Sequence, residues 1–576
     1  MTSKWNYCPL TSSQHDAELR LAARYSGVPP ISELLVKRGH TDAKEAEQFL
    51  HPSLRDLHDP FLMPEMDRAV ARLNKAMGRK EKIRVYGDYD VDGTTAVALV
   101  YRYLRQYYSN IDYDIPTRGE DGYGISLATI DQAAEDGVTL FIILDCGIKA
   151  KEEVAYALER GIDFIICDHH VADDSLPPAA AILNPKLAGS TYPCRHLSGC
   201  GVGYKLMQAF AVSNGLSTAE LEGMLDLVAV SIAADIVPMV GENRVLAYYG
   251  LKRLNSTAAN IGIKAIIRLC GLSGKEIKIS DVIFKIGPRI NAAGRMQSGR
   301  EAVDLLVCRN MNDAMALARD IDRRNQERKE LDHRITDEAT ALIEEQAAMW
   351  ADRKSIVVYN EGWHKGIIGI VASRLTEQYY KPTVVLTRSN GMATGSSRSV
   401  QGFDVYAAVG SARHLLETFG GHTYAVGLSL REENIPEFTR IFEEYVAAHI
   451  TPEQETHTLE IDAYLTFAEL TAEFMSVLHK FNPFGPGNQK PVFCTRGVRD
   501  FGTSKAVGKS GEHLKLDLVD ETCGKVFPGI AFNAAPAHLE AVRSGRPFDI
   551  LYTIDESRRK GGARTIQLMV KEIIHS

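Results

Sequence analysis

Apolar and polar positions between residues 83 and 170 follow two alternating patterns. Short continuous apolar runs predict strands, and stretches with one apolar side predict helices. The predicted strands are 83–86, 138–144 and 163–167, and the predicted helices are 94–108 and 150–160. Strands that alternate with helices form a parallel sheet with helices on both faces, so this region is predicted to be an α/β domain.

Each predicted strand ends in a polar cluster. Asp88 and Asp90 follow the first strand, Asp145 follows the second, and the triplet Asp-His-His at 168–170 follows the third. Ligands of open parallel sheets bind beyond the carboxyl ends of the strands, so these clusters are expected to converge. A solvated acidic turn would explain one cluster but not three. Asp145 directly follows apolar residues, where an unpaired buried carboxylate would cost several kcal/mol by order of magnitude, and a cation would offset that cost.

The segment VYGDYDVDG at 85–93 carries three carboxylates on alternate positions. A calcium loop of the EF-hand type needs an acid at the twelfth position, which is Leu99 here, so that hypothesis fails. The order D-V-D-G-T at 90–94 is also the nucleophile pattern expected of haloacid-dehalogenase-like phosphatases. A third hypothesis is a divalent-metal cluster towards which Asp88 and Asp90 both project. On these residues alone, the last two hypotheses stay open beside a solvated turn.

The remainder of the chain predicts a long helix and two further domains. Residues 310–349 contain no Gly or Pro and mix both charge signs, which predicts a long, largely solvated helix. Strands at 355–360 and 383–387 around a helix predict a second α/β domain. Short strands after residue 450 predict a β-barrel, a fold that commonly binds single-stranded nucleic acid. The predicted domains are 1–309 with an N-terminal extension, 310–349, 350–449 and 450–576.

Composition narrows the class of protein. The chain has 576 residues, of which 45% are hydrophobic and 24% charged, as expected of a globular protein with several domains. No apolar run is long enough for a membrane span and the first residues lack a signal-peptide core, so a cytoplasmic location and no membrane partner are expected. The nine cysteines form no C-x-x-C pair. Since the net charge is -8, any nucleic-acid site must be a local basic surface.

Eight motifs in order resemble the RecJ family of single-strand-specific 5′→3′ exonucleases, within the DHH phosphoesterase superfamily. They cover nearly the whole chain: GDYDVDG, LDCG, DHH, SIAADIVPM (231–239), GPRINAAGR (287–295), GWHKGIIGIVASRL (362–375), GSSRSV (395–400) and GGH (420–422). The resemblance implies a DHH domain, a DHHA1 domain beyond the long helix, and a C-terminal oligonucleotide-binding barrel of the OB type. The phosphatase hypothesis leaves Asp145 and the DHH triplet unexplained, so the metal hypothesis is preferred.

The resemblance also implies a set of metal ligands. One ion would be held by Asp90, Asp145, His169 and Asp235, and a second by Asp88 and Asp145. Carboxylates with one imidazole suit Mn²⁺ or Mg²⁺. Position 84 departs from the small phosphoesterases of the superfamily, which usually have a histidine four places before the first metal aspartate; here it is arginine. One of the two ions is therefore expected to bind more weakly.

Other residues receive roles around these ions. His170 is the candidate for contacting the scissile phosphate or for proton transfer, and Asp168 is expected to orient the histidines. The resemblance further implies that Ser396, Arg398 and one arginine of GPRINAAGR bind the 5′-phosphate of the strand. The two arginines of that motif are Arg289 and Arg295. The remaining candidates are His422, near the interdomain cleft, and Arg118.

The function implied is a metal-dependent exonuclease that releases 5′-mononucleotides from single-stranded DNA in repair and recombination. The expected partners are a single-strand-binding protein and a helicase, and the expected state is a monomer. Two other classes remain as alternatives: a catalytically silent binding protein on the same scaffold, and a small-nucleotide phosphodiesterase. The first typically lacks the metal ligands, all of which are present here. The second is separated from an exonuclease by whether a long strand is digested.

Overall fold

The computed structural model describes residues 4–25, 28–116, 124–296, 299–345, 352–558 and 564–575. By its contacts, the chain divides into two compact units. The larger unit contains Trp5–Pro116, Glu120–Gly287 and Glu460–Ser576. The smaller unit contains Pro288–Leu459. Each unit is described separately below.

The larger unit contains the predicted parallel sheet. Its five strands lie in the order β3-β2-β4-β5-β6, and every neighbouring pair is parallel. The strands are β2 (Lys82–Gly87), β3 (Ile111–Asp114), β4 (Val138–Leu144), β5 (Asp163–Cys167) and β6 (Ala181–Leu183). Chain order reverses between β2 and β4, so the carboxyl ends of these two strands form the switch point at which ligands of such sheets bind. The predicted α/β class is confirmed.

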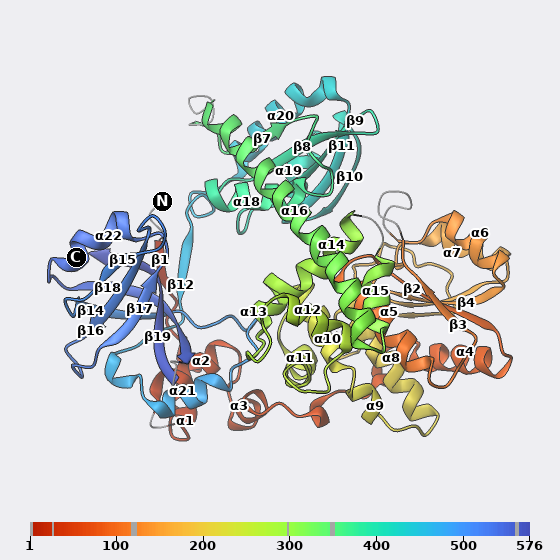
Figure 1. Cartoon of the computed structure of the whole chain (residues 1–576), viewed down its shortest axis with the longest axis horizontal. Coiled ribbons are helices and arrows are strands. Elements are labelled where there is room, and N and C mark those ends of the chain that lie inside the picture. Colours follow the sequence, from red (N-terminus) through yellow and green to blue (C-terminus); the bar gives the residue numbers. More distant parts are fainter. Residues whose placement is uncertain are drawn as a thin grey trace. The chain divides into compact units, whose positions relative to one another are not determined.

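Helices cover both faces of this sheet. Figure 1 shows α6 and α7 on one face and α4 and α8 on the other. The bounds of the helices around the sheet are α4 (Met66–Gly78), α5 (Val91–Leu104), α6 (Leu127–Glu135), α7 (Lys151–Glu159), α8 (Gly199–Ser213), α10 (Leu225–Ala234), α11 (Gly241–Leu254) and α12 (Ile261–Leu269). α10 is buried along nearly its whole length, because it lies between α5, α8 and α11.

The C-terminal strands close into a barrel. Antiparallel pairs join β14 to β16 and to β18, β16 to β17, and β18 to β19, while β17 and β19 are parallel. The ring is therefore β14-β18-β19-β17-β16, with α22 between β17 and β18 in the chain. The bounds are β14 (Phe493–Asp500), β15 (Lys505–Val507), β16 (His513–Val519), β17 (Phe527–Ala531), α22 (Ala535–Arg543), β18 (Phe548–Arg558) and β19 (Arg564–His575). A closed five-stranded ring is the OB architecture that the sequence predicted.

The N-terminal helices pack with this barrel. Side chains of α1 (Ser12–Ala22), α2 (Pro29–Lys37) and α3 (Ala43–Leu50) share one hydrophobic core with the barrel strands and with α21 (Ala472–His479). The predicted domain 1–309 grouped these residues with the parallel sheet instead. Short amphipathic helices show which face is apolar but not which partner covers it, so the sequence could not reveal this pairing. The other predicted boundaries stay predictions.

The smaller unit contains the long helix and a second sheet. α16 runs from Met311 to Glu345, as predicted, and is preceded by α14 (Gly287–Met296) and α15 (Arg300–Val307). The sheet has the order β10-β11-β9-β8-β7, in which only β7 and β8 are parallel. The bounds are β7 (Ile356–Tyr359), α18 (Ile368–Tyr379), β8 (Thr383–Ser389), β9 (Met392–Arg398), α19 (Val405–Gly410), β10 (Leu416–His422), β11 (Ala425–Leu430) and α20 (Ile435–His449). One core joins α19 and α20 to this sheet, and another joins α16 and α18 to it.

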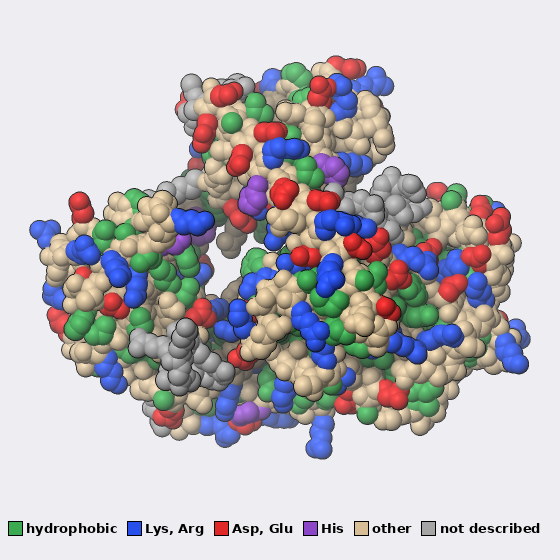
Figure 2. All heavy atoms as spheres, viewed as in Figure 1, with side chains coloured by type: hydrophobic (Ala, Val, Ile, Leu, Met, Phe, Trp, Pro, Cys, Tyr) green, Lys and Arg blue, Asp and Glu red, His purple; other side chains and the backbone are tan. Residues whose placement is uncertain are grey.

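Surface charge is mixed. Figure 2 shows Lys and Arg side chains interspersed with Asp and Glu over the face drawn, in keeping with 66 basic and 74 acidic residues in the chain. Within the described residues, no helix is both long and apolar enough to cross a membrane.

Candidate active site

Two carboxylates stand at the junction of β2 and α5. Asp88 follows β2 and is buried, and Asp90 caps α5 by accepting a hydrogen bond from the N–H of Gly93 at 3.1 Å. Glycine is required at position 93 because a Cβ there would lie 2.2 Å from the carbonyl oxygen of Asp88. Burial and the charge of Asp92 raise the pKa of Asp90. The local fold therefore holds acidic groups together although their charges repel.

The next strand end supplies Asp145. It follows β4 with φ of 61°, in the left-handed region, and its N–H donates to the carbonyl oxygen of Cys167 at 2.9 Å. Non-glycine residues held in this conformation cluster at functional sites. Burial, followed by the charges of Asp92 and Asp90, raises the pKa of Asp145 well above its ordinary value. Asp145 is thus a buried carboxylate surrounded by other carboxylates.

His169 and Asp235 complete this group from β5 and α10. Nε2 of His169 lies 3.1 Å from Oδ1 of Asp145 and 3.6 Å from Oδ2 of Asp235. Nδ1 of His169 is also buried and makes no hydrogen bond to a described residue. Burial, followed by the charges of Asp92 and Asp90, raises the pKa of Asp235 to about 8. Burial lowers the pKa of His169.

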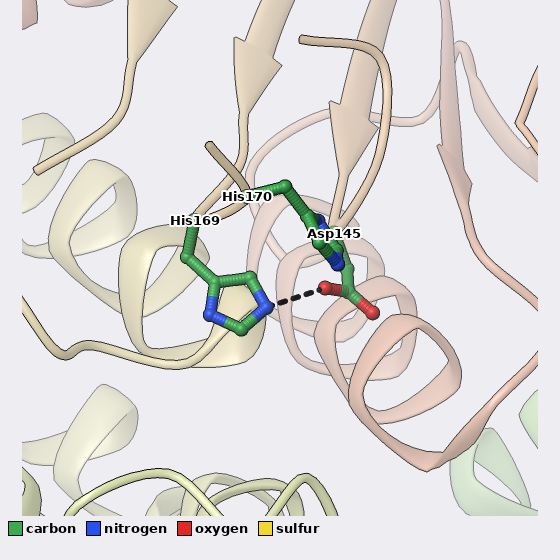
Figure 3. A group of neighbouring side chains, drawn as sticks. All are labelled: Asp145, His169 and His170. Atoms are coloured by element: carbon green, nitrogen blue, oxygen red, sulfur yellow. Dashed lines mark ion pairs between the residues drawn. The ribbon is translucent and has the colours of Figure 1, made fainter. Parts of the chain in front are cut away.

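Three overlapping sets of side chains have ligand atoms within 4.8 Å of one another: Asp88, Asp90 and Asp145; Asp145, His169 and His170; and Asp92, His169 and Asp235. Figure 3 shows Asp145 beside the two histidines, with His169 directed at its carboxylate. All five predicted ligands are therefore brought together. Asp90 falls in the set with Asp88, and none of these three sets joins it to His169 and Asp235, so the predicted four-ligand arrangement stays a prediction.

The donors in these sets fit a hard divalent cation. Carboxylate oxygens and one imidazole nitrogen suit Mn²⁺ or Mg²⁺. The raised pKa of Asp145 reflects its burial among carboxylates that repel it, and Nδ1 of His169 is buried without a hydrogen bond to a described residue. A cation bound among them would offset both costs.

Asp168 fixes the conformation of the two histidines. Its buried carboxylate accepts hydrogen bonds from the N–H groups of Ile148, His169 and His170, at 3.0, 2.7 and 3.0 Å. It also lies 2.7 Å from Nδ1 of His170. Burial would raise the pKa of Asp168, but the hydrogen bond and charge of His170 and these backbone donors together lower it to about 2. The ionised Asp168 in turn outweighs burial at His170 and raises the pKa of that imidazole.

Asp92 is a member of the cluster to which the sequence assigned no role. Its carboxylate accepts hydrogen bonds from the N–H groups of Gly199 and Cys200 and from the hydroxyl of Ser231, each at 2.7 Å. Asp92 therefore ties α5 to the N-terminus of α8 and to α10, where it also benefits from the helix dipole. Its place in the alternating acidic segment was the available signal. The three hydrogen bonds make it an anchor of the site.

The smaller unit contains Ser396 and Arg398, the residues predicted to bind the 5′-phosphate of the DNA. Both lie on β9. The Arg398 guanidinium donates to the Ser396 hydroxyl at 2.8 Å and to the carbonyl oxygen of Ser397 at 2.7 Å. Burial lowers its pKa. A Cβ at Gly369 would lie 3.1 Å from the Ser396 hydroxyl and 3.2 Å from an Arg398 nitrogen, so the first turn of α18 approaches both groups. A hydroxyl, a guanidinium and a helix N-terminus together favour an anion.

His422 lies on the same face of this sheet. Arg398 pairs with Ala425 on β11, and Ala425 pairs with His422 on β10, so these residues project from one side at the same end of the sheet. Ser396 is in register with Gly427, which pairs with Gly420, and a Cβ at Gly420 would meet nothing within 4 Å. An exposed strip without side chains therefore lies beside Ser396.

Of the three other arginines predicted as candidates for binding the 5′-phosphate, only Arg289 has a described side chain. Arg289 forms an ion pair with Asp322 of α16 at 2.8 Å. Arg118 and the side chain of Arg295 lie outside the described residues. The participation of one of these arginines in binding the 5′-phosphate therefore stays a prediction.

Three protein-family models match separate segments of the chain. They are described as "DHH family, N-terminal domain", "DHHA1 domain" and "RecJ OB domain", and they match residues 82–232, 352–448 and 461–572, respectively. The single-stranded-DNA-specific exonuclease RecJ of Haemophilus influenzae is 33% identical over 570 residues, which cover 96% of this chain and 98% of that protein. The chain belongs to the RecJ family. The RecJ of Bacillus subtilis is 36% identical over 498 residues, which cover 86% of this chain and 62% of that protein. The chain therefore spans less than two thirds of that relative.

A solved RecJ structure supports the same assignment. The crystal structure of RecJ from Thermus thermophilus in complex with Mn²⁺ superposes with a TM-score of 0.83 at 26% identity, covering all of this chain and 80% of that one. Membership of the RecJ family confirms the predicted class, a metal-dependent exonuclease, and the predicted succession of DHH, DHHA1 and OB domains.

In this RecJ-family chain, the Arg84 side chain binds two carboxylates that do not belong to the acidic cluster. Its guanidinium makes two hydrogen bonds to Asp112 and one to Asp136, each at 2.8 Å. Arg84 therefore supplies no ligand where the small phosphoesterases have histidine. The expected weaker binding of one ion stays a prediction.

Proposed function

We propose that this chain is a single-strand-specific DNA exonuclease that digests from the 5′ end and releases 5′-mononucleotides. The observation that carries the proposal is the set of overlapping carboxylate and imidazole groups around Asp145, at the switch point of the parallel sheet. Two divalent ions, Mn²⁺ or Mg²⁺, would be held by Asp88, Asp90, Asp145, His169 and Asp235. When bound, such ions lower the pKa of water and neutralise charge that develops on a phosphoryl group.

His170 is assigned proton transfer. Release of a 5′-mononucleotide breaks the bond between phosphorus and the 3′-oxygen of the first nucleotide, and that oxygen must gain a proton. The Nδ1 side of His170 faces Asp168, so Nε2 is the nitrogen that donates. Asp168 stabilises the imidazolium form, consistent with the raised pKa of His170. Asp168 is therefore a positioning residue for this step.

Recognition of the 5′ end of the DNA strand is assigned to the smaller unit. Ser396, Arg398 and the first turn of α18 would bind the terminal phosphate, and the bare strip beside Gly420 and Gly427 leaves room for the first nucleotide. His422 stands at the margin of this surface. Hydrolysis leaves the phosphate on the second nucleotide, so every turnover regenerates the group that is recognised. Repeated digestion from one end follows from that chemistry.

The barrel is assigned to the body of the strand. Phe501 and Phe532 are 59% and 60% exposed, and Lys505 and Lys515 are exposed on β15 and β16. Exposed aromatic rings and lysines on a barrel of this kind can stack bases and contact phosphates. Family membership also supports a role in DNA repair and recombination. The proposed partners are a single-strand-binding protein and a helicase, and the proposed state is a monomer.

The test is a digest of a long single-stranded oligonucleotide, its duplex, and a dinucleotide, each with and without Mn²⁺, beside Asp145→Ala as a control. The proposal predicts that the single strand alone is digested completely, that EDTA stops the reaction, and that Asp145→Ala is inactive. Rapid cleavage of the dinucleotide with an intact long strand would instead support a small-nucleotide phosphodiesterase. Binding of the strand without any cleavage would support a silent binding protein.

A further inference from the structure

The segment that follows the metal-ligand candidate Asp235 is strained. Asp235 ends α10, and Ile236 has φ of 57°, a left-handed conformation that is unfavourable for a β-branched residue. The Ile236 side chain is 60% exposed, so its own packing does little to stabilise this conformation. Contacts elsewhere must hold the segment, because such strain persists only where the surroundings determine it.

Those contacts come from a loop of the C-terminal domain. The N–H of Met239, four residues after Asp235, donates to the carbonyl oxygen of Pro486 at 2.6 Å. Two glycines of the same loop lie against the segment. A Cβ at Gly485 would lie 3.1 Å from the Met239 Cβ, and one at Gly487 would lie 3.1 Å from a Val240 methyl carbon. The loop therefore approaches 239–240 more closely than a side chain would allow without movement.

The loop is itself held firmly. The buried amide of Asn488 donates to the carbonyl oxygens of Phe481 and Pro483, at 2.8 and 2.9 Å. Gly485 and Asn488 exchange two backbone hydrogen bonds of 3.0 Å. Arg244, in α11, donates to the carbonyl oxygens of Phe481 and Pro483 at 3.0 and 3.4 Å. The loop is consequently tied to the helix that begins directly after the strained segment.

We propose that the loop formed by residues 481–488 positions Asp235 for metal binding, and so couples the C-terminal domain to the metal centre. The inference rests on the proposed metal centre. It gives the barrel a second role that does not depend on contact with DNA. The residues of the loop act through Asp235, so they are positioning residues. Disturbing the loop should weaken metal binding in the full-length chain even when no DNA is present.

The test compares two glycine substitutions that impose the same backbone strain. Gly487 has φ of 74° and lies against Val240, whereas Gly545, elsewhere in the C-terminal domain, has φ of 78° and nothing within 4 Å of an added Cβ. Gly487→Ala should weaken Mn²⁺ binding about 10-fold or more, as expected when the support of a metal ligand is lost. Gly545→Ala should bind Mn²⁺ as the wild type does. Gly485→Ala serves as a second variant because its added methyl group meets Met239 without a positive φ.

Binding of Mn²⁺ to the full-length proteins is measured by calorimetry without DNA, and the Mn²⁺ concentration for half-maximal digestion is measured separately. Circular dichroism checks folding. The inference is supported if Gly487→Ala or Gly485→Ala shifts both quantities while Gly545→Ala shifts neither. It is overturned if the folded loop variants bind Mn²⁺ normally, or if Gly545→Ala shifts binding equally. If the wild type binds no Mn²⁺, the metal centre itself is wrong. If the wild type binds Mn²⁺ but digests no strand, the proposed function fails. The effect of the loop variants on Mn²⁺ binding still tests the coupling.

Discussion

The cluster around Asp145 predicts that the metal-free protein is destabilised by its own charges, and Asp235→Asn isolates one of them. Asn has nearly the shape of Asp but carries no charge, so the variant removes the repulsion from Asp90 and Asp92 without opening a cavity. The pKa of Asp235 is raised from its ordinary 3.8 to about 8, by burial first and then by these neighbours. The metal-free variant should therefore be more stable than the wild type at neutral and alkaline pH.

The sign and size of the effect follow from linkage. A raised carboxyl pKa means that the folded protein binds the proton more tightly than the unfolded chain, so the free energy of unfolding falls as pH rises between about 4 and about 8. Each pKa unit corresponds to about 1.4 kcal/mol, which sets an upper bound of about 6 kcal/mol. The side chain is 28% exposed, so solvent screens part of the repulsion that Asp92 and Asp90 exert on it. An advantage of about 2–4 kcal/mol for Asp235→Asn above about pH 8 is therefore expected, declining towards about pH 4.

Urea unfolding of the full-length proteins in EDTA, followed by circular dichroism at several pH values, measures this difference. Asp16→Asn, at an exposed carboxylate of α1, is the matched control and should change nothing. Added Mn²⁺ should stabilise the wild type more than Asp235→Asn, because the variant lacks a ligand charge. If the wild type and Asp235→Asn instead lose stability in parallel as pH rises, Asp235 bears no raised pKa.

Three further predictions concern activity. Asp145→Ala should fold but lose about 1000-fold or more in kcat/KM, since several kcal/mol of metal-assisted stabilisation disappear; near wild-type digestion would show that Asp145 holds no ion. Mn²⁺ or Mg²⁺ should restore activity after chelation but Ca²⁺ should not, because it takes more ligands at longer distances; full digestion with Ca²⁺ alone would contradict the assigned cation class. Arg398→Ala should reduce the preference for 5′-phosphate over 5′-hydroxyl strands by about 10-fold or more, with Mn²⁺ binding unchanged; an unaltered ratio of kcat/KM for the two ends would remove Arg398 from end recognition.

The core of the fold could be predicted because its signals are local. The apolar runs at 138–144 and 163–167 coincide with β4 and β5, since central strands of a parallel sheet are apolar on both faces. The edge strands β3 and β6 were not predicted, because they have only four and three residues and no long apolar run. Packing of the N-terminal helices on the barrel was also missed, since it joins positions more than four hundred residues apart.

The candidate site was predictable where a strand end delivers a side chain to a shared edge. Asp88, Asp145 and His169 are of this kind, and the structure brings them together. The role of Asp92 was hidden because its partners, Gly199 and Ser231, lie on helices distant in sequence. The ion pair between Arg289 and Asp322 depends on how α14 packs on α16, which no motif reports. Hydrogen-bond partners of this type are properties of the fold and not of a segment.

The order in which a single strand loses its nucleotides is the decisive test of the proposed 5′→3′ digestion. Two copies of one long 5′-phosphorylated oligonucleotide, one labelled at the first nucleotide and the other at the last, are digested with Mn²⁺ and an excess of enzyme over strands. Digestion from the 5′ end should release the first label at once as a 5′-mononucleotide, while the last label stays on strands that shorten progressively. Early release of the last label as a mononucleotide, or internal fragments from both strands, would contradict it.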